Sequence, residues 1–451
     1  LNGPYLTRCM MENQTVPRYL VVACGSYDGT VFAMAHEHTK INPDGPSLLK
    51  PIFIDPDAHP SSVTALALGG DLLVSGSSDE VIQVFSVSGR CRLGCLELHT
   101  GCVRHLQFAP DLSYANRQPS HLFSLGEDAC FAIWRQQVAT TTADSEAGSK
   151  SFSRVPAWPC IRQMRRHKGP ISAFALHPSC RLALTLSDDK TLRVWNLLRG
   201  RQAYTVRLKT LASGATDVSF TPSGRYLLML CPNRFDLIDL SPPAGDTGVK
   251  PLATCEFGRP FSAFPIVFDE DDPLTTDCPY LYLLAAFGNI LRAFRCPLWS
   301  EARREIQALG ETRLPGKRVK VLKVLSWPEN LMQSQLEVYS NRRKILVTVS
   351  TDLDGSYVRG YAINIQTELG NKGLSAPRAV LPVFTYDIHG IRLTQIDASW
   401  SLNEQQQEVN ACEMIDAEFA TEEEKERDDD EGSDTPEENL SIPDSYGNLK
   451  D

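Results

Sequence analysis

Residues 167–197 read HKGPISAFALHPSCRLALTLSDDKTLRVWNL, and this stretch decides the fold. Three apolar runs of strand length lie in it: Ile171–Leu176, Leu182–Leu186 and Thr191–Trp195. Turn residues separate the runs, HPS after the first and SDD after the second. Short apolar runs divided by turn residues predict β-strands joined as hairpins.

A histidine precedes the first run and a tryptophan ends the third, which is typical of a WD-type repeat, one blade of a β-propeller. In such a blade the turn aspartate accepts a hydrogen bond from the upstream histidine, and a serine or threonine on the middle strand orients that ring. The four residues here are His167, Thr185, Asp189 and Trp195. A buried network of this kind stabilises the fold only when every member is bonded.

The same offsets recur upstream in the chain. The run SLGEDACFAIW supplies Ser124, Asp128 and Trp134, with His99 before it. Two less complete copies are SGSSDEVIQVF, with Ser75, Asp79, Phe85 and the upstream His59, and ACGSYDGTVFAM, with Cys24, Asp28 and Met34. His59 and His99 are 40 residues apart, which fits the period of this repeat.

Strand-like segments continue without the histidine–aspartate–tryptophan set to residue 400. We therefore predict an all-β, seven-bladed WD-repeat propeller over residues 19–400, with residues 1–18 as an N-terminal extension and residues 136–157 inserted in blade three. The first blade lacks its opening strand, and Gly390–Trp400 is predicted to supply it. Pairing the two chain ends would leave the ring without a free edge. Trp299–Leu309 is predicted to be a short inserted helix.

Composition indicates an ordinary globular protein, with 42% apolar and 22% charged residues in 451. No apolar run reaches the roughly 18 residues of a membrane-spanning helix. The 13 cysteines are scattered and form no C-x-x-C pair, so we expect no zinc site and a reducing compartment. The chain begins with Leu1, so we expect it to be incomplete at its start, and Leu1–Pro17 has no apolar core of a signal peptide.

Charge is unevenly distributed along the chain. Of 55 acidic and 45 basic residues, 18 and 3 lie in residues 401–451, which leaves 37 and 42 for residues 1–400. The acidic segment is predicted to be a disordered tail. Its contrast with the basic body indicates either surroundings rich in nucleic acid or a simple solubilising tail.

Basic residues precede the predicted first strands of blades four to seven, and such loops emerge on one face of a propeller. They are Arg165, Arg166, Lys168, Lys209, Arg259, Lys317, Arg318 and Lys320. Phosphate backbones are attracted to a field of this kind without any reading of sequence. We predict that this half-ring docks on rRNA or on an acidic partner surface; scattered solubilising charge is the alternative.

The sequence contains no nucleotide-binding, metalloprotease or nucleophile-elbow motif. His167, Asp189 and Thr185 resemble a nucleophilic triad, but their repetition from blade to blade indicates a structural role. His36, His38 and His105 have no ligand-like companions and are expected at the surface or at strand ends. We predict a protein that is not an enzyme and has no catalytic or metal site, no cofactor, no membrane association and no small-molecule substrate.

Several segments carry a family resemblance: SGSSDEVIQVFSV, HTGCVRHLQF, RVKVLKV, IRLTQIDASW and the stretch from His167 to Arg201. Together they make the chain similar to the WD-repeat proteins of the PAK-interacting-protein-like family, from about Tyr19 to Trp400 with gaps. The run KTLRVWNLLRGR is the most specific. Residues 136–157 and Trp299–Leu309 depart from the family pattern, so family contacts at those places do not transfer.

The resemblance implies a nuclear and nucleolar scaffold in ribosome biogenesis, which assists assembly and rRNA maturation of the large-subunit precursor. Its implied partners are pre-ribosomal proteins and rRNA, with the chain a monomer inside a larger assembly. The alternatives are an adaptor that binds and restrains a PAK-type protein kinase, and a substrate receptor of a ubiquitin ligase.

Overall fold

The computed structural model describes residues 19–37, 47–109, 119–137, 157–208, 215–240, 251–270, 280–298, 306–326, 343–352, 355–364 and 380–401. The chain divides into two units, Leu1–Leu402 and Asn403–Asp451, and every described residue belongs to the first. Among the described residues all regular structure is β-strand, and none of them forms a helix long and apolar enough to cross a membrane.

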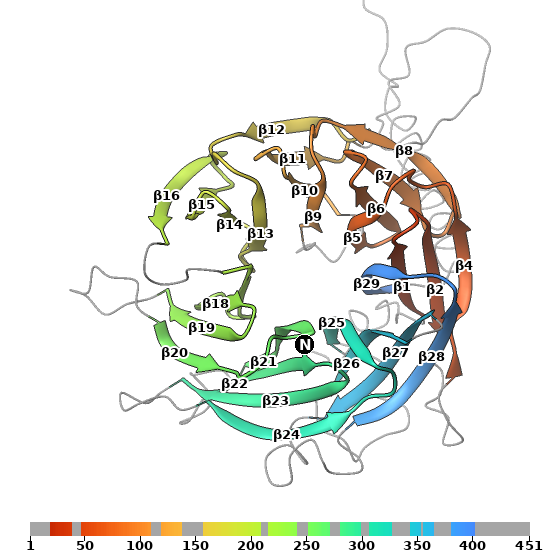
Figure 1. The fold of residues 1–451 in the computed structure, drawn as a ribbon. Helices are drawn as coiled ribbons and strands as arrows, with labels where there is room; N and C mark the ends of the chain where they lie inside the picture. The colour runs from red at the N-terminus through yellow and green to blue at the C-terminus, as the bar shows by residue number, and fades with distance from the viewer. Residues whose placement is uncertain are drawn as a thin grey trace, which may run out of the picture. The chain divides into compact units, whose positions relative to one another are not determined.

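Seven sheets stand around a common axis, each antiparallel apart from one short parallel strand in blade seven, which confirms the predicted seven-bladed propeller (Figure 1). Blades one and two consist of β29 (Leu393–Ser401), β1 (Tyr19–Ser26), β2 (Val31–Glu37) and β4 (Lys50–Asp55), then β5 (Val63–Gly69), β6 (Leu72–Ser77), β7 (Val81–Ser86) and β8 (Cys91–Glu97). Blades three and four consist of β9 (Val103–Phe108), β10 (His121–Gly126), β11 (Phe131–Arg135) and β12 (Cys160–Met164), then β13 (Ile171–Leu176), β14 (Leu182–Ser187), β15 (Thr191–Asn196) and β16 (Arg201–Arg207).

The remaining blades follow in chain order. Blades five and six consist of β17 (Asp217–Phe220), β18 (Tyr226–Cys231), β19 (Arg234–Asp239) and β20 (Pro251–Glu256), then β21 (Ala263–Glu270), β22 (Tyr280–Phe287), β23 (Ile290–Pro297) and β24 (Gln307–Arg313). Blade seven consists of β25 (Arg318–Ser326), β26 (Arg343–Thr351), β27 (Gly355–Asn364), β28 (Val380–His389) and the short β3 (Ser47–Leu48).

The core lies between the blades. Side chains alternate along each strand, so both faces of a blade carry apolar residues that only a neighbouring blade can cover. Between blades three and four, for example, the Phe131 ring lies 5.4 Å from that of Phe174 and 5.7 Å from that of Trp195. Each blade therefore depends on the next for burial.

The ring closes as predicted, with β29 as the innermost strand of blade one. Tyr19 pairs with Ser401 and Cys24 with Ile396 in antiparallel register. An ion pair supports this closure, since Lys323 Nζ of β25 lies 2.6 Å from Asp397 Oδ1 of β29. The other carboxylate oxygen of Asp397 accepts the backbone N–H of Leu68 on β5. One carboxylate thus ties blades seven, one and two together.

A second link across the closure was not predicted. The two-residue strand β3 pairs in parallel with β28, so a segment between two strands of blade one adds an edge to blade seven. Ser47 Oγ donates to the carbonyl of Val383 and lies 2.5 Å from His36 Nε2. His36 was expected at the surface or at a strand end; it lies next to the end of β2 and is buried, with an exposed fraction of 3%. His105 is half-buried, and its Nε2 lies 2.8 Å from the carbonyl oxygen of Ser172.

The predicted helix at Trp299–Leu309 was wrong in its described part. Residues 307–309 belong to β24, which is the fourth strand that blade six needs to complete its sheet. The other predictions on residues 1–18, 138–156, 299–305 and 402–451 lie outside the described residues, and so does the expectation for His38. At the base of the predicted insertion, Gln137 and Ala157 form an isolated β-bridge.

Candidate functional site

Blade four brings its four predicted residues into one hydrogen-bonded chain. His167 Nδ1 lies 3.1 Å from Asp189 Oδ2, and its Nε2 lies 2.7 Å from Thr185 Oγ1. Trp195 Nε1 donates to the same hydroxyl at 2.8 Å. If the histidine is neutral and Nδ1 donates to the carboxylate, Nε2 accepts from Thr185, whose oxygen accepts from Trp195. Each of the hydrogen-bonding atoms that join these four side chains then has a partner.

Electrostatics keep this histidine neutral and its aspartate ionised. Burial lowers the pKa of His167 below its usual value, and the hydrogen bond to Asp189 only partly opposes this. Burial works against ionisation of Asp189, but hydrogen bonds from Thr191, the Lys168 N–H and His167 outweigh it and lower its pKa to about 2. The two shifts agree with one neutral ring beside one carboxylate.

Blades three and two repeat this arrangement. His99 Nδ1 lies 3.1 Å from Asp128 Oδ1, its Nε2 lies 2.8 Å from Ser124 Oγ, and Trp134 Nε1 donates to Ser124 at 2.8 Å. In blade two, His59 lies 2.8 Å from Asp79 and 2.7 Å from Ser75. Phe85 fills the tryptophan position there and is buried.

These sets resemble a Ser-His-Asp triad, but a substrate could not reach their hydroxyl groups. The hydroxyl residues Thr185 and Ser124 are fully buried, with exposed fractions of 0%. Each hydroxyl also holds a tryptophan indole. Because a nucleophile must reach its substrate, these hydroxyls do not fit that role. The geometry is that of a structural network, which orients the turn of each blade.

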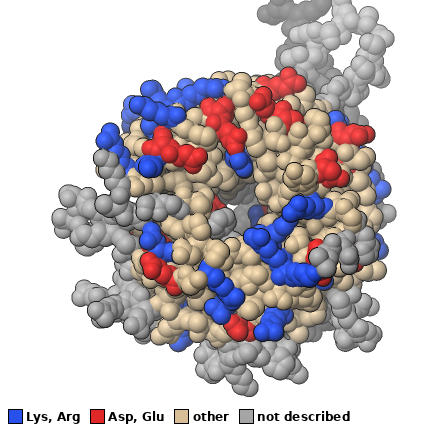
Figure 2. Space-filling model, viewed as in Figure 1, with Lys and Arg blue, Asp and Glu red and all other residues tan. Residues whose placement is uncertain are grey.

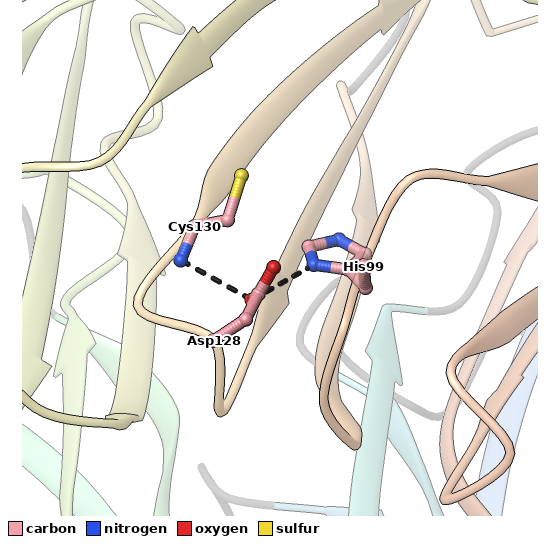
Figure 3. A group of neighbouring side chains, drawn as sticks. All are labelled: His99, Asp128 and Cys130. Carbon is pink, nitrogen blue, oxygen red and sulfur yellow. Dashed lines mark hydrogen bonds and ion pairs between the residues drawn. The ribbon is translucent and has the colours of Figure 1, made fainter.

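A potential metal-binding group lies at the same place in blade three. His99, Asp128 and Cys130 bring their ligand atoms within 4.8 Å of one another (Figure 3). Burial and the nearby Asp128 charge raise the pKa of the Cys130 thiol to about 11, so it is held as a neutral thiol. Arg165 lies 3.4 Å from Asp128 Oδ2 and supplies a cation where an ion would bind. Thr191 follows Asp189 at the same offset in blade four, so we assign Cys130 to the network.

The eight predicted basic residues meet different surroundings. We define the loop face as the end of the blades that carries the turns between second and third strands and the connections into each first strand. Arg166 and Lys168 are exposed on it, while Arg165 pairs with Asp128. Lys317 lies 3.6 Å from Asp352, and the Arg259 guanidinium lies 5.4 Å from the centre of the Phe287 ring.

Two of these residues belong to a strand rather than to a loop, which corrects the prediction. Arg318 begins β25, and Lys320 lies within it and donates to the carbonyl of Leu393 at 3.4 Å. Lys209 lies outside the described residues. The expected half-ring is thus uneven: Arg165 and Lys317 pair with carboxylates, whereas Arg318 and Lys320 have no carboxylate partner among the described residues.

Sequence reasoning missed Arg392, which is exposed and directly precedes β29. The predicted strand Gly390–Trp400 included this residue, so it was not counted with the loops. The sequence could have indicated Arg392, because the residues directly before the first strand of blade one lie on the loop face, as they do in the other blades. Basic side chains gather beside the centre of the ring over β25 and β29 (Figure 2).

Comparison with known proteins agrees with this architecture. The family model for the WD domain, G-beta repeat, matches residues 158–196, which include blade four's first three strands and its histidine. The chain is a WD-repeat β-propeller. The decisive residues are those of the stretch that begins at His167.

Several similar proteins carry a name that refers to a kinase partner. The chain is 29% identical over 219 residues to p21-activated protein kinase-interacting protein 1-like of Gallus gallus, which is 49% of this chain and 50% of that protein. It is 28% identical to p21-activated protein kinase-interacting protein 1 of Homo sapiens, over 51% of this chain and 52% of the relative. It is 31% identical to Protein MAK11 of Saccharomyces cerevisiae, over 36% of each. The matched part spans about half of the first two relatives.

Proposed function

We propose that this chain is a non-catalytic WD-repeat scaffold that assists assembly and rRNA maturation of the large ribosomal subunit precursor, in the nucleus and nucleolus. The observation that carries the proposal is the group of cations on the loop face where blades seven and one meet (Figure 2). A nucleic-acid backbone is attracted to such a group without sequence readout. The family resemblance seen in the sequence supports the same role.

The buried networks also support a surface function. Their hydroxyls and carboxylates are used within the blades, so the function belongs to exposed residues. Pre-ribosomal proteins and rRNA are the proposed partners, with the chain as one member of a larger assembly.

The test is sedimentation of a tagged full chain in a sucrose gradient, with and without ribonuclease. We expect co-migration with large-subunit precursors that ribonuclease abolishes. The double variant Arg318→Glu, Arg392→Glu should move to the light fractions. Its matched control is Arg181→Glu, Arg225→Glu, because both residues are exposed in turns between first and second strands, at the opposite end of the blades. Migration of the unaltered chain as a small free particle in both gradients would reject the proposal.

A kinase adaptor is the second candidate, and the names of several similar proteins favour it. Under that proposal the chain binds and restrains a PAK-type protein kinase. Purified kinase should then be retained by the immobilised full chain and show reduced activity. Retention without any loss of activity would leave a binding role and exclude the restraining one.

A further inference from the structure

The first strands of several blades carry a special position near their entry from the loop face. The pairing between the first and second strands shifts there by one residue, as in a β-bulge. The residue left unpaired extends its side chain toward the first strand of the following blade. Thr394 Oγ1 donates to the carbonyl of Val63 at 2.6 Å, and Thr64 Oγ1 donates to that of Val103 at 2.6 Å. A short neutral hydroxyl is sufficient for this contact between blades.

Two blades place a cation at this position instead. In blade three it is Arg104, whose guanidinium pairs with the carboxylate of Glu127. In blade seven it is Lys320, which makes the contact to Leu393 but has no carboxylate partner among the described residues. The positive charge of blade three is thus neutralised, and that of blade seven is not.

Two further cations increase the positive potential around Lys320. Burial, Arg392 and Arg318 together lower the pKa of Lys320. Neither arginine forms an ion pair with a carboxylate in the part of the chain that the structure describes. Holding three positive groups together disfavours the charged state of each unless an anion lies between them. The cluster therefore has the electrostatic character of an anion site.

An exposed aromatic ring adjoins the cluster. Tyr27 has an exposed fraction of 63%, and the Arg392 guanidinium lies 5.9 Å from its ring centre. The Tyr27 N–H donates to the Arg392 carbonyl at 2.8 Å, so the two backbones are held together. The neighbouring Asp28 carboxylate accepts from Ser26 Oγ. A tyrosine fixed at its backbone and open on its ring can stack on a flat partner.

We propose that Tyr27, Arg318, Lys320 and Arg392 form a binding site for single-stranded RNA at the junction of blades seven and one. The three cations bind consecutive phosphates, and the Tyr27 ring stacks on an unpaired base. Proteins that bind single strands without sequence preference combine a positive track with aromatic platforms in this way. An acidic peptide would use the cations alone and would gain nothing from the ring. The inference rests on the proposed association with a ribosomal precursor and specifies which RNA form and which residues take part.

The test measures binding of a fluorescently labelled, short single-stranded oligoadenylate to the full chain by anisotropy over a series of salt concentrations. Tyr27→Ala should weaken binding about tenfold, and Tyr27→Phe should leave it unchanged, because stacking needs the ring and not the hydroxyl. Arg318→Ala and Arg392→Ala should each reduce the slope of log affinity against log salt by about 0.7. Lys320 is left intact because it also bonds to Leu393.

Matched controls exist elsewhere on the surface. Tyr204, on the outer strand β16, has an exposed fraction of 64%, close to that of Tyr27. Arg225 lies 5.2 Å from the Tyr226 ring centre, but it pairs with Asp239 at 3.4 Å and Tyr226 is buried, so it is an exposed arginine outside any cation cluster. Tyr204→Ala and Arg225→Ala should bind RNA like the unaltered chain.

Two results would overturn the inference. One is equal RNA binding by Tyr27→Ala and Tyr204→Ala. The other is polyglutamate binding that matches RNA binding and is weakened by the arginine variants but not by Tyr27→Ala, which would assign the site to an acidic peptide. Sedimentation separates this failure from that of the proposed function. If the Tyr27→Ala variant binds RNA normally and still migrates with precursors, only the proposed RNA site is rejected and the proposed function stands.

Discussion

Blade four and blade six place opposite chemistry at equivalent backbone positions. The entry sequence HKGPISA of blade four corresponds to FGRPFSA of blade six, so Phe257 stands where His167 stands. The strand registers continue the correspondence, because Ala173 pairs with Leu186 and Ala263 pairs with Ala286. In blade four a series of hydrogen-bonded side chains links the entry loop to the second and third strands. In blade six, packed phenylalanine rings make this link.

The remaining members of the network are replaced in the same manner. By register, Ala285 takes the place of Thr185, and Phe294 takes that of Trp195. The Phe257 ring lies 5.1 Å from that of Phe287 and 5.3 Å from that of Phe294. Blade six has a shorter turn and no aspartate in it. A blade therefore needs its entry loop anchored and every buried group satisfied, and either hydrogen bonds or aromatic packing meets this need.

The largest effect should come from the third-strand ring in either blade. Trp195→Ala and Phe294→Ala should each lower the free energy of unfolding by about 3–5 kcal/mol, because each removes a large buried side chain. Urea denaturation followed by circular dichroism measures both, with the exposed Tyr204→Ala as control. A much smaller loss for Phe294→Ala would mean that blade six does not depend on its rings and would break the comparison.

The turn aspartate should have the next largest effect, in blade four and not in blade six, whose turn has no aspartate. Asp189 accepts from the Lys168 N–H and the Thr191 N–H at 3.0 Å each and from Thr191 Oγ1 at 2.6 Å. Asp189→Ala should cost about 2–3 kcal/mol, the scale of hydrogen bonds to a charged group. The same denaturation measurement applies. The neighbouring exposed Asp188→Ala is the control, and equal losses for the two variants would show that the network is not the cause.

A smaller change tests the hydroxyl that joins the two halves of the network. Thr185→Val keeps the shape but leaves His167 Nε2 and Trp195 Nε1 without a partner, at a cost of about 1–3 kcal/mol. Thr185→Ser should cost less because the hydroxyl remains. In blade six the matched position is already apolar, so Ala285→Ser should destabilise by burying a hydroxyl without a designed partner. An unchanged stability for Thr185→Val would show that the hydroxyl is dispensable.

The smallest expected difference is in the response to acid. Burial lowers the pKa of His59 and His167, although Asp79 and Asp189 respectively oppose it, and Arg92 and Arg193 add to it. The unfolded chain then takes up protons first as pH falls below about 6.5, so the stability from a neutral ring is present above that pH and lost below it. The loss is at most about 1.4 kcal/mol per pH unit for each histidine.

Amide hydrogen exchange at pH 7.5 and pH 5.5 measures this effect blade by blade. Protection in β6 and β14, which carry the hydroxyl partners, should fall at the lower pH after correction for intrinsic exchange rates. The strands of blade six, whose corresponding positions hold no histidine, should change less. Equal loss in both regions would indicate a global transition rather than titration of the networks.

Much of the fold was predictable because its signals are local. Hairpin turns, strand periodicity and the offsets among His167, Thr185 and Asp189 are fixed by chain geometry over a few residues. The anchoring residues of the apolar blades were harder to predict, since the role of Phe257 is apparent only when its segment is aligned with that of His167. The fourth strand of blade six was mistaken for a helix, because β24 is exposed on the outside and has little apolar pattern.

The candidate site was predictable only in part. Arg318 and Lys320 stand out in the sequence as basic residues before a strand, but nothing local brings Arg392 and Tyr27 to them. Those two approach because β29 closes the ring beside β1, and the residues that meet are far apart in the chain. The same contact explains why Arg392 joins Arg318 as a charge beside Lys320.

By itself, the sequence determined the repeat, the number of blades and the members of each hydrogen-bonded set. These depend on short-range spacing, because the strands, turns and network residues of one blade are close together in the sequence. Only the tertiary structure decided which charges are neutralised and which remain. Arg104 meets Glu127 within its own blade, whereas Lys320 meets a further cation, Arg392, across the ring closure. Coulomb interactions act through space, so their balance is set by where the ring brings distant strands together.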